Sequence, residues 1–159
     1  IALALASEGS FDRVIATEIA QGAKAVARMN ADALPHPHSP AVLRGGDLLL
    51  PLTTQDRITA IVSNPPYIAE AEMAEMPASV RDWEPRLALV SDNDGLAHTF
   101  RIIDDAPRVL QAGGLLAFEV DSRRAQRVAS HVREHGGYDA VQVHNDFTGR
   151  ERYVLAVRR

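Results

Sequence analysis

Short apolar runs alternate along the chain with longer stretches that have the composition or the spacing of helices. The apolar runs are of strand length and cover residues 13–18, 41–44, 58–63, 115–120, 141–144 and 153–157. The helical stretches cover residues 1–8, 20–33, 96–110 and 122–135. Strands that alternate with helices predict an α/β fold with a mostly parallel sheet and helices on both faces.

Local signals place several element ends. Ser122 is the expected N-cap of the last helix, and Gly136-Gly137 are expected to end it. Gly113-Gly114 are expected to lie just past the end of the helix over 96–110. Residues 146–152 join the last two strands without a helix, so these strands should form a C-terminal antiparallel hairpin.

The stretch from 68 to 95 has weak periodicity. Residues 69–76 predict a short helix, and the remainder, which contains Trp83, predicts an ordered loop. Trp83 is equally consistent with a lid over a site and with a small separate core.

Composition narrows the class of protein. Apolar residues make up 46% of the 159 residues and charged residues 24%, which is typical of one globular domain over 1–159. The absence of cysteine excludes disulfides and thiolate metal sites, and no cluster of histidines with carboxylates suggests a metal. The net charge of −4 shows no basic excess, so direct nucleic-acid binding is not expected. No apolar run reaches the ~20 residues of a membrane span, so we expect a cytoplasmic protein without membrane contact.

The most informative stretch is Ser63-Asn64-Pro65-Pro66-Tyr67, which follows the apolar run over 58–63. Proline cannot donate to a strand ladder, so the strand must end here. The residue before a proline is held extended, which makes the turn stiff. Ligands of α/β sheets bind outside the carboxyl ends of the strands, so this turn is a candidate site.

The chemistry of this turn suits a planar NH2 group. The Asn64 side-chain oxygen and the Pro65 carbonyl are two acceptors for its two hydrogens, and the Tyr67 ring can lie on its flat face. Holding both hydrogens orients the nitrogen and stabilises positive charge that develops on it. The alternative is a Pro-Pro turn that only ends a strand.

This turn resembles the Asn-Pro-Pro-Tyr motif of amino-methyltransferases that use S-adenosylmethionine and release S-adenosylhomocysteine. The resemblance implies a Rossmann-like class I methyltransferase fold. It also implies that a first strand and a Gly-rich loop precede Ile1, so that this chain would hold six of seven expected strands. The chain begins inside an apolar helix without an initiator methionine, and we expect part of the natural protein to precede it.

The same resemblance assigns cofactor contacts at two strand ends. Glu18 lies about 20 residues after the expected Gly-rich loop, where an acidic residue binds ribose hydroxyls, and Ile19 could pack on the adenine. Asp47 and Leu48 match the positions that accept from the adenine amine and cover the ring. Glu18 could instead cap the next helix, and Asp47 could form an Asx turn. Asn64 is expected to contact both the cofactor and the substrate.

The remaining motifs narrow the resemblance to one family. Residues 83–89 (Trp-Glu-Pro-Arg-Leu-Ala-Leu), 94–96 (Asp-Gly-Leu), 113–119 and 149–154, together with 64–68, resemble the peptide chain release factor glutamine methyltransferases. That family methylates the side-chain amide nitrogen of the glutamine in the Gly-Gly-Gln loop of release factors. The resemblance implies that Asn64, Pro65, Pro66 and Tyr67 bind this glutamine and that an N-terminal helical domain helps to dock the release factor.

Other functions stay open at this point. A methyltransferase that acts on the N6 amine of adenine, or on another exocyclic amine of DNA or RNA, could hold a flipped base in the same turn. A glutamine methyltransferase acting on a ribosomal protein, and a non-catalytic binding module, are further alternatives. Arg123, Arg124 and Arg127 are interpreted as an exposed basic edge at the start of a helix.

Overall fold

The structure is a computed structural model that describes residues 1–159. The chain forms two compact units, residues 1–53 and residues 54–159. The expectation of a single domain over 1–159 stays a prediction.

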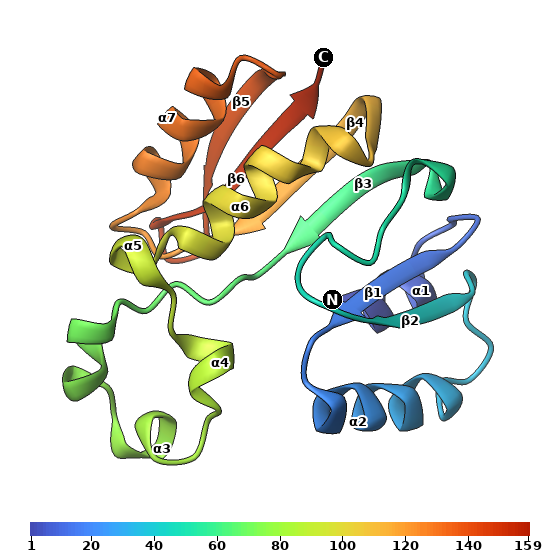
Figure 1. Cartoon of the computed structure of the whole chain (residues 1–159), viewed down its shortest axis with the longest axis horizontal. Coiled ribbons are helices and arrows are strands. Elements are labelled where there is room, and N and C mark those ends of the chain that lie inside the picture. The colour runs from blue at the N-terminus through green and yellow to red at the C-terminus, as the bar shows by residue number, and fades with distance from the viewer. The chain divides into compact units, whose positions relative to one another are not determined.

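The first unit contains two helices and two strands. They are α1 (Ala2–Glu8), β1 (Val14–Glu18), α2 (Gln21–Asp32) and β2 (Ala41–Gly45). The two strands pair in parallel, from Val14 opposite Ala41 to Glu18 opposite Gly45. Both helices contact both strands (Figure 1). Since the strands run in the same direction, their carboxyl ends lie at one edge of this small sheet.

The second unit contains four strands with short helical elements between them. In chain order these are the 3-10 turn η1 (Thr54–Asp56), β3 (Ile58–Ser63), the 3-10 turn η2 (Glu70–Glu75), α3 (Ala78–Arg81), α4 (Arg86–Leu89), α5 (Asp92–Gly95), α6 (Ala97–Asp105), the 3-10 turn η3 (Ala106–Arg108), β4 (Leu110–Glu119), α7 (Ala125–His135), β5 (Tyr138–Asn145) and β6 (Glu151–Arg158).

The four strands form one sheet in the order β3-β4-β6-β5. Strands β3 and β4 are parallel, whereas β6 is antiparallel to both β4 and β5 (Figure 1). Strand β6 is therefore antiparallel to the other three strands of this sheet. The mostly parallel sheet and the C-terminal antiparallel hairpin are both confirmed.

The core of the second unit lies between this sheet and the helices α6 and α7. Leu116 and Phe118 of β4, Ile103 of α6 and Val128 of α7 are each no more than 2% exposed. Helix α7 contacts β5, β6 and α6. The buried Tyr138 hydroxyl of β5 donates to the Ile103 carbonyl at 2.5 Å and so joins the sheet to α6.

The helix predicted over residues 96–110 is wrong at its end. Helix α6 stops at Asp105, η3 follows, and β4 already begins at Leu110. Pro107 has no N–H for a helical hydrogen bond, which favours the break. The pairing of β4 passes from Ile58 opposite Leu110 to Ala60 opposite Leu115, so the Gly113-Gly114 pair lies in a bulge inside the strand.

The predicted N-cap Ser122 is also wrong. Helix α7 begins at Ala125, and Arg124 occupies the N-cap position. Residues before it form a turn in which the Asp121 carboxylate accepts from the Arg123 N–H at 2.9 Å and the Asp121 carbonyl accepts from the Arg124 N–H at 2.9 Å. At the other end, Gly136 has a left-handed backbone with φ of 74° and stops the helix as expected.

Residues 68–95 are more helical than predicted. The expected short helix over 69–76 is present as η2, but α3 and α4 form where a loop was expected. Trp83, between α3 and α4, is 85% exposed, so it does not form the small core that one interpretation proposed. None of the helices combines the length and the apolar character that crossing a membrane requires.

Candidate active site

The Asn-Pro-Pro-Tyr turn begins where β3 ends. Ser63, the last residue of β3, pairs with Phe118 of β4, and the chain then leaves the sheet. Asn64 is exposed, Pro65 is buried and Tyr67 is half-buried. The structure therefore places Asn64 at the carboxyl end of a parallel strand with its side chain accessible, as the sequence predicts.

The residue after the turn is fixed by main-chain hydrogen bonds on both sides. The Ile68 N–H donates to the Leu89 carbonyl at 3.0 Å, and the Ser91 N–H donates to the Ile68 carbonyl at 2.9 Å. Ile68 thereby forms a parallel bridge with Val90. This bridge gives residues 89–91 a structural role that the sequence did not reveal, because they anchor the exit of the turn.

Gly95 packs directly against the backbone of the turn. A Cβ atom at Gly95 would lie 2.2 Å from the Tyr67 carbonyl oxygen and 3.0 Å from Nε of Arg124. Gly95 has φ of +78°, and the two residues before it, Asn93 and Asp94, also have positive φ. A left-handed backbone at residues other than glycine is unfavourable and concentrates near functional sites.

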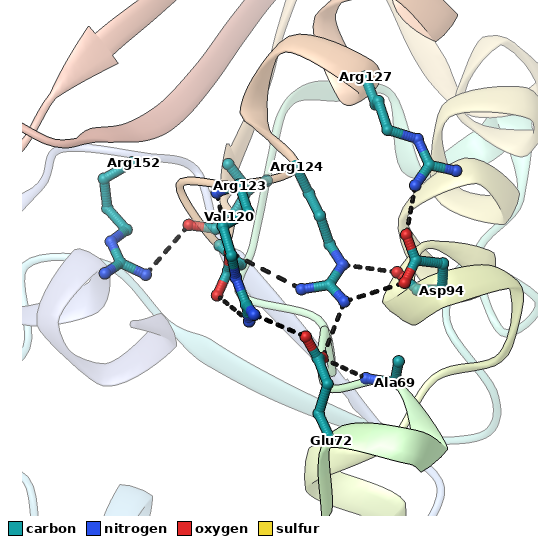
Figure 2. Close-up of polar contacts among 9 residues, drawn as sticks. Ala69, Glu72, Asp94, Val120, Arg123, Arg124, Arg127 and Arg152 are labelled. Atoms are coloured by element: carbon teal, nitrogen blue, oxygen red, sulfur yellow. Dashed lines mark hydrogen bonds and ion pairs between the residues drawn. The ribbon is translucent and has the colours of Figure 1, made fainter. Parts of the chain in front are cut away.

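Arg124 lies at the centre of an ion-pair network that reaches this turn (Figure 2). Its Nη2 atom is 2.8 Å from Oε2 of Glu72 and 3.2 Å from Oδ1 of Asp94, and its Nε donates to the Asp94 carbonyl at 2.5 Å. We call Arg124 with these two carboxylates the Arg124 bridge. The Arg124 side chain is only 5% exposed, so its interpretation as part of an exposed basic edge is wrong.

The neighbouring arginines, Arg123 and Arg127, pair with the same two carboxylates (Figure 2). Arg123 is 2.8 Å from Oε1 of Glu72, and Arg127 pairs with Oδ2 of Asp94. Their side chains are 64% and 51% exposed, so the exposed-edge interpretation holds for these two residues. Each carboxylate of the Arg124 bridge thus uses one oxygen for Arg124 and the other for an exposed arginine.

The arginines keep the carboxylates around Arg124 ionised. The Arg123 side chain, through its hydrogen bond, holds the pKa of Asp121 below its usual value despite partial burial. Burial by itself opposes ionisation of Glu72, but the Ala69 N–H and the guanidinium groups of Arg124 and Arg123 outweigh it and lower its pKa. A neutral carboxylic acid would have less attraction for the buried guanidinium.

The first unit brings two of the predicted cofactor residues to one sheet edge. Glu18 ends β1, and its carbonyl accepts from the Gly46 N–H at 3.0 Å, which ties it to the turn before Asp47. Oε1 of Glu18 accepts from the Ala20 N–H at 2.8 Å just before α2. This bond is made to the N-cap residue Ala20 and not to an N–H of the helix, so Glu18 does not cap α2. An ionised carboxylate has further lone pairs for ribose hydroxyls.

The other predicted cofactor residues lie close by in the chain. Ile19 is 48% exposed, so an apolar side chain is available beside the Glu18 carboxylate. Leu48 has a left-handed backbone with φ of 47°, in a turn where the Leu50 N–H donates to the Asp47 carbonyl at 3.0 Å. Carboxylate acceptors beside accessible apolar groups fit the ribose and adenine of S-adenosylmethionine. Glu18, Ile19, Asp47 and Leu48 belong to the first unit and Asn64–Tyr67 to the second.

We predict that Gly95→Ala destabilises the protein more than Gly136→Ala does. Both glycines have similar positive φ, but a Cβ at Gly136 meets nothing within 4 Å, whereas one at Gly95 meets the Tyr67 carbonyl. The clash should add about 1–3 kcal/mol to the strain that both variants share. Urea denaturation of both variants measures the difference, and equal losses of stability would contradict the packing described here.

Acid should weaken the network through Glu72 and Asp121. Folding lowers the pKa of both carboxyl groups. Each ionised carboxylate therefore stabilises the folded protein at a pH above its unfolded-state pKa, and this stabilisation is lost as the pH falls through the folded-state pKa. We expect this loss below about pH 4. In urea denaturation between pH 7 and pH 3, Glu72→Gln should show a smaller fall in unfolding free energy than the wild type.

Glu75→Gln is the matched control, because Glu75 is an exposed glutamate in the same 3-10 turn. It should follow the wild-type pH curve. Identical curves for Glu72→Gln and the wild type would show that the arginines do not hold Glu72 ionised.

Comparison with known proteins gives no matching family model. Curated relatives do match along nearly the whole chain. The release factor glutamine methyltransferase of Clostridium acetobutylicum is 35% identical over 159 residues, covering 99% of this chain and 55% of the relative. Its counterpart in Moorella thermoacetica is 42% identical over 159 residues, covering 100% and 55%. The counterpart in Cereibacter sphaeroides is 40% identical over 156 residues, covering 98% and 55%.

Solved structures agree on the fold. A ribosomal protein L11 methylase from Lactobacillus delbrueckii subsp. bulgaricus has a TM-score of 0.59 at 17% identity and covers 92% of this chain and 58% of its own. A methyltransferase from Pyrococcus furiosus has a TM-score of 0.61 at 18% identity, with coverages of 92% and 62%. The expected class I methyltransferase fold is therefore confirmed. The chain spans about half the length of the curated relatives it matches, and these relatives are release factor glutamine methyltransferases.

Proposed function

We propose that the protein transfers a methyl group from S-adenosylmethionine to the side-chain amide nitrogen of a glutamine in peptide chain release factors. The observation that carries this proposal is the Asn64-Pro65-Pro66-Tyr67 turn at the carboxyl end of β3, with the Asn64 side chain exposed. The names of the curated relatives supply the substrate class. Within the release factor, we assign the glutamine of the Gly-Gly-Gln loop.

In this proposal the turn binds the glutamine amide through two oxygen atoms. Oδ1 of Asn64 and the Pro65 carbonyl each accept one N–H of the amide, and the Tyr67 ring lies against the amide plane. Neither proline has an N–H that would compete as a donor. Fixing both hydrogens orients the nitrogen for attack and stabilises the positive charge that it gains.

The first unit would hold the cofactor. Glu18 would accept from the ribose hydroxyls, Asp47 from the adenine amine, and Ile19 and Leu48 would cover the ring. When bound, S-adenosylmethionine supplies a methyl group on a positively charged sulfur, and the product is S-adenosylhomocysteine. The chain has no dedicated base in the turn, so we assign the proton that leaves the substrate nitrogen to water.

The test of function uses the full-length gene product with labelled S-adenosylmethionine. The substrates are a bacterial release factor, the same factor with its Gly-Gly-Gln glutamine changed to alanine, a glutamine-containing ribosomal protein, and single- and double-stranded DNA. We expect label on the intact release factor alone. Label on DNA, on the ribosomal protein or on the alanine variant would contradict the proposal.

In the same assay Asn64→Ala should lower kcat about 100-fold or more, because one of the two acceptors for the amide hydrogens is lost. Asn145→Ala, at an exposed asparagine of β5, is the matched control and should keep wild-type activity. An Asn64→Ala variant as active as the control would remove the turn from the mechanism.

The cofactor assignment has a test that needs no activity. Glu18→Gln should weaken S-adenosylhomocysteine binding about 10- to 100-fold in isothermal titration calorimetry, because hydrogen bonds to an ionised acceptor are lost. The glutamine can still accept from the Ala20 N–H, so the local turn is kept. Glu8→Gln, at an exposed glutamate of α1, should bind as the wild type does. Unchanged binding by Glu18→Gln would exclude Glu18 from the cofactor site.

A further inference from the structure

The Arg124 bridge connects three segments that are far apart in the sequence. Arg124 precedes α7, Glu72 lies in η2 and Asp94 lies in α5 (Figure 2). The first partner is 52 positions from Arg124 and the second 30 positions. A buried arginine with partners on two other segments holds those segments at fixed positions relative to α7.

On one side the bridge reaches the exit of the Asn-Pro-Pro-Tyr turn through a single atom. Oε2 of Glu72 accepts both from Nη2 of Arg124 at 2.8 Å and from the Ala69 N–H at 2.9 Å. Ala69 is two residues beyond Tyr67 and directly follows Ile68. The N–H and the carbonyl of Ile68 are both hydrogen-bonded to the main chain of residues 89 and 91. The position of Glu72, and with it the backbone after Tyr67, depends on the guanidinium group.

On the other side the bridge reaches the same turn through Gly95. Nε of Arg124 donates to the Asp94 carbonyl at 2.5 Å, in the stretch of positive φ that ends at Gly95. Gly95 in turn packs so closely on the Tyr67 carbonyl that no side chain fits there. The guanidinium group therefore supports the Tyr67 backbone from two directions, by hydrogen bonds through Glu72 and by packing through Gly95.

The chemistry of this position requires arginine. A guanidinium group offers five N–H donors in a rigid plane, and Arg124 uses Nε and Nη2 for different partners. Nη1 is buried without a hydrogen-bond partner and lies 3.7 Å from Oδ1 of Asp121. Lysine has one ammonium group on a flexible stem and could not reach Glu72 and the Asp94 carbonyl with this geometry.

We propose that Arg124 is a positioning residue for methyl transfer, which sets the Asn-Pro-Pro-Tyr turn in the geometry that the substrate amide requires. This inference rests on the proposed function for the reaction, but the bridge itself is independent of it. A shift of about 1 Å in a substrate-binding group can lower the rate about 100-fold without loss of the fold. Arg124 acts on catalysis through Glu72 and Asp94.

The first arm of the test measures hydrogen exchange and needs no substrate. In Arg124→Ala, the amides of residues 67–69 should exchange at least about tenfold faster than in the wild type, because the shared Glu72 oxygen is released. Arg123→Ala and Arg127→Ala are matched controls: each removes an exposed arginine from the other oxygen of Glu72 or Asp94. Both controls should exchange within about threefold of the wild type.

The second arm measures steady-state kinetics of the full-length gene product on the release factor. Arg124→Ala should lower kcat about 10- to 100-fold, while KM for S-adenosylmethionine changes less than about twofold. Arg124→Lys should recover little of the lost kcat, and the two control variants should keep it. A purely structural role would lower the melting temperature and leave kcat per folded molecule unchanged, and that result would overturn the proposal.

The outcomes distinguish a failure of the proposed function from a failure of the proposed role of Arg124. If the wild type methylates no release factor, the proposed function fails, and unchanged exchange in Arg124→Ala would then overturn the bridge as well. If Arg124→Ala does not fold, Glu72→Ala takes its place, because it removes the oxygen atom that accepts from both Arg124 and the Ala69 N–H. It should accelerate exchange at Ala69 and lower kcat, and wild-type values for both would overturn the proposal.

Discussion

The buried charge of Arg124 is the constraint on which the second unit depends most. A guanidinium group that is 5% exposed must be paired, since an uncompensated buried charge strongly destabilises a fold. Its partners are Glu72 and Asp94, which come from segments without extensive regular structure of their own. The need to neutralise one charge thus orders the polypeptide between β3 and α6, and this polypeptide supports the Asn-Pro-Pro-Tyr turn.

Parallel strands then determine where the candidate functional side chains lie. The carboxyl ends of β1 and β2 meet through the bond from the Gly46 N–H to the Glu18 carbonyl. The carboxyl end of β3 leads directly into Asn64. In each unit the regular sheet ends where the candidate binding residues begin, so a rigid sheet positions the turns to which we assign the chemistry.

Much of this arrangement was predictable because its signals are local. The prolines after β3 end that strand whatever surrounds them. The apolar runs predict β1, β2, β3 and β6 to within two residues, and the helical stretches predict α1 and α2 equally well. The reversed direction of β6 followed from a connection too short for a helix. Asn64 could be singled out because an amide before two prolines has no necessary role in a turn.

The wrong predictions concern positions whose structure depends on residues distant in the sequence. The end of α6 was misplaced because the glycines at 113–114 look like a helix stop, whereas they form a bulge imposed by pairing with β3. Ser122 resembles a cap, but the Asp121 carboxylate and Arg123 form a turn there instead. Arg124 was misinterpreted because its partners are 30 and 52 positions away, and no periodicity within its own helix reveals them. Because Arg124 lies beside Arg123 and Arg127 in the sequence, the local pattern predicts an exposed basic edge.

In the proposed reaction, Asn64 and Pro65 hold the amide that receives the methyl group. The most direct measurement is a crystal structure of the full-length gene product with S-adenosylhomocysteine and a release factor or its Gly-Gly-Gln loop peptide. We expect the glutamine amide nitrogen to lie about 3 Å from Oδ1 of Asn64 and from the Pro65 carbonyl oxygen. A glutamine bound away from this turn, or held there by other atoms, would contradict the proposed role of Asn64 and Pro65.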